Sequence, residues 1–176
     1  LGVKAAEDFA PNAKSAILVD NLSGKVLYEK NADEKLAPAS MTKLGSMLLI
    51  MEAIDNGSLK LEDKVTISDE AANMGGSQVF LQAGEVYTVH DLLKGIAIAS
   101  GNDAVVAMSE KIGGSQVAFV EMLNKRLKEI GAVNTNFVNA HGLDAEGHYS
   151  TARDMSIIAR ELLKHPKILE YTSIYE

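Results

Sequence analysis

The segment 40–56 is apolar on nearly every side of the helix that its periodicity predicts. One stripe at helical spacing is formed by Leu44, Met47, Leu48, Met51 and Ile54. The other side carries Leu49, Ile50 and Ala53, and a C-terminal stop follows at Asn56-Gly57. A helix that is hydrophobic all round must be covered by other elements. The segment therefore predicts a lobe of several helices packed around a central one.

Two short apolar segments precede this helix, Ser15–Asp20 and Lys25–Glu29, and the turn between them predicts a β-hairpin. An isolated hairpin is only marginally stable in water, so we expect it to belong to a larger antiparallel sheet. The chain thus predicts a mixed α/β fold of the α+β type. We expect residues 1–35 to form the N-terminal segment and the first two strands, and residues 36–176 the helical lobe. The remaining strands are expected outside this chain, which leaves a hairpin edge that invites pairing with another chain.

Downstream of the central helix, the periodicity predicts one ribbon and further helices. The ribbon would pair Val65–Ser68 with Glu85–Thr88, and a capping box at Thr88–Asp91 opens the next helix. The remaining landmarks are a break at Ala99–Asn102, an apolar stretch at Ala104–Met108, an amphipathic helix from Phe119 to Gly131, a polar segment at Asn134–Tyr149 and a last helix from Thr151.

The composition excludes several classes of function. The 176-residue chain has a net charge of −7, and such a surface repels polyphosphate, so we expect no nucleic-acid partner. The absence of cysteine excludes disulfides, thiolate zinc sites and a cysteine nucleophile. The four histidines lack metal-binding spacing and are expected to be solvated or capping, and no phosphate-binding motif occurs, so we expect no metal or cofactor. The longest apolar run is far shorter than the ~20 residues of a membrane-spanning helix.

Ser40 and Lys43 stand three residues apart at the head of the central helix. Positions i and i+3 are neighbours on a helix face, so the Lys43 amine can reach the Ser40 hydroxyl. Ser40 also shares the apolar stripe, and we expect it to face the body of the protein. Burial there lowers the pKa of a lysine, and a neutral amine activates a serine nucleophile. The structural alternative is that Ser40 is an N-cap and S-x-x-K a chance pattern.

A second polar pair lies at Ser100-Gly101-Asn102, in the break between two apolar helical segments. This S-x-N arrangement places a hydroxyl and a carboxamide on one short connection, although taken alone a polar interhelix turn is the preferred interpretation. Together, S-x-x-K and S-x-N match the first two parts of a serine acyl-transfer set that ends in K-T-G.

The chain resembles the low-molecular-mass penicillin-binding proteins, the D-alanyl-D-alanine carboxypeptidases of bacterial cell-wall maturation. The resemblance covers nearly the whole chain, in the segments "AILVDNLSGKVLYEKNAD", "PASMTKL", "GGSQVFLQAGEVYTVHDLLKGIAIASGNDA" and "NAHGLDAEGHYSTARDM". It implies the fold shared by penicillin-binding proteins and serine β-lactamases, with a helical lobe and an incomplete antiparallel sheet represented by the hairpin.

The resemblance also implies a role for each motif residue. Ser40 would be the nucleophile, with its backbone N–H in the oxyanion hole, and Lys43 its general base. Ser100 would relay protons toward the leaving group, and Asn102 would orient the substrate amide and Lys43. The substrate would be the D-Ala-D-Ala end of a peptidoglycan stem peptide, cleaved through an acyl-serine, and β-lactam antibiotics would acylate the same serine. The implied location is extracytoplasmic, in the bacterial cell envelope, where relatives attach peripherally through a C-terminal anchor that this chain lacks.

Two further regions follow from the resemblance. Residues 141–154 would form the loop under the site, ordered by Asp154, although Thr151–Asp154 by itself indicates a capping box. Gly75, Gly76 and Ser77 would edge the cleft, although a plain turn explains them equally.

The third motif, K-T-G, does not occur in this sequence. We therefore expect the 176-residue chain alone to be inactive or nearly so, because losing one oxyanion donor costs roughly 10²–10³ in rate. Two alternatives stay open. A serine β-lactamase shares the first two motifs, but the chain has no E-x-x-L-N and carries S-G-N rather than S-D-N. A non-catalytic module of the same fold is the other.

Overall fold

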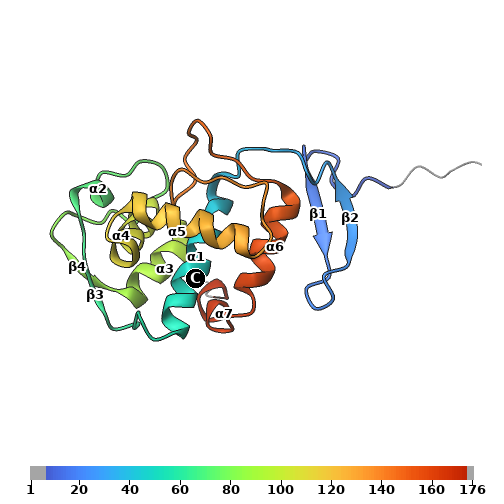
Figure 1. The fold of residues 1–176 in the computed structure, drawn as a ribbon. Coiled ribbons are helices and arrows are strands. Elements are labelled where there is room, and N and C mark those ends of the chain that lie inside the picture. Colours follow the sequence, from blue (N-terminus) through green and yellow to red (C-terminus); the bar gives the residue numbers. More distant parts are fainter. Residues whose placement is uncertain (1–6, 174–176) are drawn as a thin grey trace, which may run out of the picture.

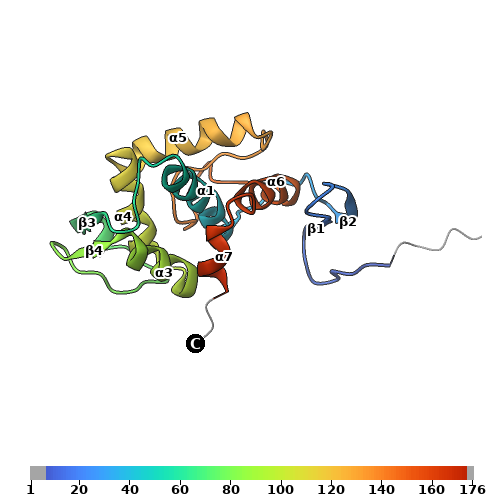
Figure 2. The same cartoon turned by 90° about the horizontal axis from the view of Figure 1, so that it is seen from below.

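Helix α1 (Thr42–Asp55) is the central element of a computed structural model that describes residues 7–173. The larger helices around it are α3 (Val89–Ala99), α4 (Asn102–Gly113), α5 (Gln116–Glu129) and α6 (Ala152–Leu162). Figure 2 shows α1 between α5 and α3, with α6 beside it. Ten of the 14 residues of α1 are buried, which confirms the prediction of a helix covered on nearly all sides.

The apolar core has two parts, and α1 separates them. One part lies between α1, α3 and α4, and it includes Leu48, Ile50, Leu93 and Val106. The other lies between α1, α5 and α6, and it includes Leu49, Phe119, Leu123 and Ile158. Because successive residues of α1 point into different parts, both of its faces had to be apolar.

The predicted hairpin and ribbon both form. Strands β1 (Ala16–Val19) and β2 (Val26–Lys30) pair antiparallel, with Ile17 opposite Glu29. Strands β3 (Lys64–Thr66) and β4 (Val86–Thr88) form the second antiparallel pair. Figure 1 shows the β1–β2 hairpin at one end of the molecule, next to α6.

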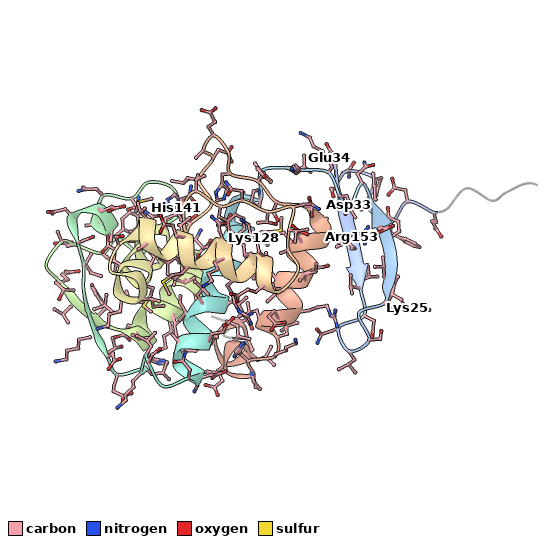
Figure 3. All side chains as sticks on the ribbon, in the orientation of Figure 1. Lys25, Asp33, Glu34, Lys128, His141 and Arg153 are labelled. Carbon is pink, nitrogen blue, oxygen red and sulfur yellow. The ribbon has the colours of Figure 1, made fainter. Side chains whose placement is uncertain are left out.

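An arginine of α6 connects the hairpin segment to the helical lobe through ion pairs. Arg153 Nε donates to the Asp33 carboxylate at 2.8 Å, and its Nη2 forms an ion pair with Glu29. Figure 3 shows Arg153 and Asp33 at this junction. Residues 1–6 of the expected N-terminal segment lie outside the described residues, and the division at residue 35 stays a prediction.

Two short helices were not anticipated from the sequence. Helix α2 (Asp69–Ala72) is a single turn capped by the Ser68 side chain, and α7 (Lys167–Thr172) follows Pro166. Helices this short contain too few turns to show a hydrophobic period. Within residues 7–173, none of the helices has the length and apolar character needed to cross a bilayer.

Candidate active site

Ser40 lies in a short 3₁₀ turn, Ala39–Met41, that precedes α1. The expected helix start at Ser40 is therefore wrong by two residues, and Ser40 makes no side-chain capping bond. Its side chain is exposed rather than turned toward the body of the protein, and it lines an open cavity of about 440 Å³. This geometry contradicts two interpretations of Ser40: that it faces the body of the protein, and that it is the N-cap of the helix.

Lys43 lies in the first turn of α1 and is only 5% exposed. Its Nζ donates a hydrogen bond to the His141 carbonyl oxygen at 2.9 Å. Burial lowers the pKa of Lys43 from 10.5 to about 8, as expected for an ammonium that has lost hydration. Within the described residues, no hydrogen bond joins Lys43 to Ser40, but catalytic hydrogen bonds are often long in unliganded sites.

The S-x-N motif forms the break between α3 and α4. Ser100 ends α3 in a left-handed conformation (φ +51°), and Asn102 begins α4. The backbone N–H of Asn102 donates to the Ser77 carbonyl at 2.7 Å, and its Nδ2 donates to the Gly75 carbonyl at 2.8 Å. A Cβ at Gly76 would lie 2.7 Å from Asn102 Nδ2, so this close approach requires glycine.

Asp103 also belongs to this region, although the sequence did not predict a role for it. It is fully buried, and its carboxylate accepts hydrogen bonds from the backbone N–H groups of Val79 and Leu81. These bonds fix the segment that follows Gly76 and Ser77 against α4. An aspartate in the first turn of a helix is an ordinary sequence feature, so nothing in the sequence distinguished it.

Ser40 lines two cavities, and the motif residues divide between them. The cavity of about 440 Å³ is also lined by Gly76, Ser77 and Asn102. A second cavity of about 210 Å³ is lined by Ser40, Lys43 and Ser100 together with apolar side chains. The structure thus brings the two motifs and the glycine-containing loop to one place, with Ser40 between them.

The loop between α5 and α6 forms another wall of the larger cavity, through residues 141–144. Figure 3 shows His141 where this loop passes α4 and α5. The Asn139 side chain accepts hydrogen bonds from the N–H groups of His141 and Gly142, and its Nδ2 donates to the Leu143 carbonyl. These bonds hold a tight turn whose backbone carbonyl faces Lys43.

Two of the histidines contradict the expectation that they are solvated or capping. His141 and His148 are buried, with exposed fractions of 7% and 5%. Each accepts a backbone N–H at Nδ1, from Leu143 and Val138 respectively. Burial lowers the pKa of His141 to about 4 and also lowers that of His148. The irregular loop needs internal acceptors for its N–H groups, and neutral imidazole supplies them.

Asp154 is buried near the start of α6, where its N–H donates to the Thr151 hydroxyl at 3.0 Å. The predicted N-cap is thereby confirmed. The carboxylate accepts from the Asn134 N–H at 2.8 Å and from the Thr135 hydroxyl at 2.7 Å. Asp154 is not among the residues that line the larger cavity, so it contacts the base of the loop instead.

Known proteins share this fold. A DacD D-alanyl-D-alanine carboxypeptidase from Francisella tularensis superposes with a TM-score of 0.89 at 36% identity, over 92% of this chain and 39% of that one. Penicillin-binding protein D2 from Listeria monocytogenes, in its ampicillin-bound form, superposes with a TM-score of 0.81 at 30% identity, over 92% of this chain and 66% of that one. The fold is therefore that of the penicillin-binding proteins.

The sequence comparisons identify the family of this chain among the penicillin-binding proteins. The model of peptidase family S11, D-alanyl-D-alanine carboxypeptidase, matches residues 2–176, and the chain belongs to this family. DacF of Bacillus subtilis is 58% identical over 98% of this chain and 44% of its own length. DacC of Escherichia coli is 44% identical over 86% of this chain and 40% of its own length. The chain thus spans less than half the length of these two relatives.

Proposed function

We propose that the intact protein is a serine DD-carboxypeptidase that removes the terminal D-alanine from peptidoglycan stem peptides. The observation that carries this proposal is the buried Lys43, whose pKa is lowered to about 8, next to a cavity shared with exposed Ser40. A lysine of this kind is partly neutral near neutral pH, which is the property that a general base requires. Family membership supports the same reaction class.

The chemistry assigned to Ser40 and Lys43 is an acyl transfer in two steps. Ser40 Oγ attacks the carbonyl carbon of the penultimate D-alanine while the Lys43 amine takes the hydroxyl proton. The peptide C–N bond then breaks, and the leaving D-alanine receives a proton through Ser100. Water afterwards hydrolyses the acyl-serine, which restores the Ser40 hydroxyl.

The walls of the larger cavity supply the positioning groups. Asn102 orients the substrate amide, because its carboxamide is itself fixed by the Gly75 carbonyl. Gly76 and Ser77 line the same cavity and edge the bound peptide. The Ser40 N–H belongs to a 3₁₀ turn at the start of a helix, where backbone N–H groups are free to stabilise an oxyanion. Asp154 acts indirectly, by ordering the base of the loop.

The proposed substrate places the enzyme on the outer face of the cytoplasmic membrane, where stem peptides are exposed. β-Lactam antibiotics are the second proposed ligand class, because their strained amide is attacked by the same hydroxyl. The ampicillin-bound relative from Listeria monocytogenes supports this assignment.

Release of D-alanine tests the proposal. The intact protein is incubated with a synthetic peptide ending in D-Ala-D-Ala, and free D-alanine is quantified. We expect release by the natural protein and none by Ser40→Ala, with circular dichroism confirming that the variant is folded. Equal release by both proteins would exclude Ser40 as the nucleophile.

A further inference from the structure

His148 connects the loop after α5 to the first turn of α1. Its Nε2 lies 2.8 Å from Thr42 Oγ1, and its Nδ1 accepts the Val138 N–H at 3.0 Å. A backbone N–H can only donate, so Nδ1 carries no proton and Nε2–H donates to the Thr42 hydroxyl. The imidazole is also stacked on the Phe137 ring, with a centroid separation of 5.0 Å. The ring is thus fixed in position, tautomer and orientation.

Thr42 and Lys43 are consecutive residues, and both are bound to the same loop. Thr42 is fully buried and contacts His148, while the Lys43 amine donates to the His141 carbonyl. One turn further along α1, Ser46 donates to the Ala140 carbonyl at 2.7 Å. Three successive contacts therefore hold the loop against the face of α1 that carries Lys43. The contact at Thr42 is the one of the three that joins two side chains.

We propose that His148 is a positioning residue for Lys43. Its hydrogen bond to Thr42 holds the loop against α1, and this clamp keeps the His141 carbonyl at the Lys43 amine and excludes water from that amine. This role rests on the proposed function of Lys43 as the general base. His148 lies outside both cavities and acts through its neighbours rather than on the substrate.

Burial and the charges around the loop favour the neutral form of His148. Burial lowers the pKa of His148, and the charge of Asp144 opposes this shift only in part. The pKa of His141 is lowered by burial and then by the charges of Lys43 and His148. A protonated His148 would direct an Nδ1–H against the Val138 N–H and break the anchor. The contact with Val138 therefore requires the neutral imidazole, whereas the Nε2–H that binds Thr42 is present in both protonation states.

Two substitutions of His148 each retain one of its two hydrogen bonds and remove the other. In His148→Gln, the side-chain amide reaches the position of Nε2 and retains the bond to Thr42. In His148→Asn, the shorter amide reaches only the position of Nδ1 and retains the bond to Val138. Thr42→Val removes the same contact as His148→Asn from the other side. His90→Ala is the matched control, because His90 contacts Tyr171, outside the loop.

Each variant of the intact protein is examined by three measurements: the Lys43 amine pKa by ¹³C NMR, the acylation rate with a labelled penicillin, and the melting temperature. We expect His148→Asn and Thr42→Val to raise the Lys43 pKa from about 8 toward 10.5. Acylation at pH 7 should fall roughly tenfold in both, since small misplacements of a catalytic group are costly. His148→Gln and His90→Ala should keep the natural values, and combining His148→Asn with Thr42→Val should add nothing.

Equal behaviour of His148→Asn and His148→Gln would overturn the proposal. So would a loss of melting temperature in His148→Asn without any change in the Lys43 pKa, because that result describes a purely structural residue. The NMR measurement does not depend on catalysis. If the natural protein is not acylated at all, the proposed function fails, while the Lys43 pKa still decides whether His148 positions the amine.

Discussion

A Cβ atom on Gly142 would lie 1.9 Å from the carbonyl oxygen of Ala39, the residue directly before Ser40. Gly142 also has a φ of +98°, which side chains rarely adopt. Ala39 itself is in a left-handed conformation, with φ +50°. The loop after α5 therefore packs its bare backbone against the backbone that presents Ser40, and this approach has no room for a single methyl group.

Gly142→Ala should therefore impair both stability and acylation. We expect a loss of about 2–4 kcal/mol in the free energy of unfolding. The backbone strain of alanine at a positive φ and the steric overlap of its Cβ with Ala39 both contribute to this loss. The matched control is Gly147→Ala, which has φ +79° but no atom closer than 3.8 Å to its Cβ. It should cost about 1 kcal/mol and leave acylation nearly unchanged. Chemical denaturation and penicillin labelling measure the two effects, and equal costs in both variants would contradict the close packing.

The acylation rate should rise with pH through the Lys43 pKa. Because burial lowers that pKa to about 8, the neutral base is a minor species at pH 7 and predominates above pH 9. The expected increase between these values is roughly tenfold, with half of the plateau reached near pH 8. Stopped-flow acylation of the intact protein across this range measures it. A rate that does not vary with pH would show that Lys43 is not the base.

The buried histidines should make the fold sensitive to acid. The pKa of His141 is about 4 in the folded state, below its ordinary 6.5, and that of His148 is lowered too. The unfolded chain therefore binds protons first, and stability present above pH 6.5 is lost as the pH falls toward 4. We expect His141→Gln combined with His148→Gln to reduce this loss by about 2 kcal/mol. Urea denaturation at both pH values tests it, and an unchanged loss would exclude these histidines as its source.

The hairpin should promote self-association of the 176-residue chain. Within residues 7–173, β1 and β2 pair only with each other, and Leu18 and Leu27 are more than half exposed. Unpaired edges of this kind attract further strands. Sedimentation velocity should detect concentration-dependent association, weakened in Leu27→Lys. A chain that stays monomeric at high concentration would show that the edge is protected.

The sequence predicted the fold best where an apolar pattern extends over several helical turns. The pattern of α1 predicted a central helix because its two faces meet two separate parts of the core. The hairpin and the ribbon followed from short branched segments with turns between them. The S-x-x-K and S-x-N motifs were found because each is local. The contacts that hold the glycine-containing loop at the site are not local, because the carbonyls of Gly75 and Ser77 accept hydrogen bonds from Asn102, which follows α3 in the sequence.

The features that the sequence did not predict depend on distant contacts. His148 is buried because it meets Thr42, which is 106 positions away in the chain. Asp103 is an unremarkable helix residue until the backbone of Val79 and Leu81 is placed beside it. Ser40 lies in a 3₁₀ turn rather than in α1, a difference that hydrophobic spacing does not encode.

Mass spectrometry of the acylated protein identifies the nucleophile without reference to any other residue. The intact protein is incubated with a penicillin, digested and mapped by tandem mass spectrometry. We expect one penicilloyl adduct, located on the peptide containing Ser40, at a stoichiometry near one and absent in Ser40→Ala. An adduct on another residue, or labelling that persists in Ser40→Ala, would contradict it.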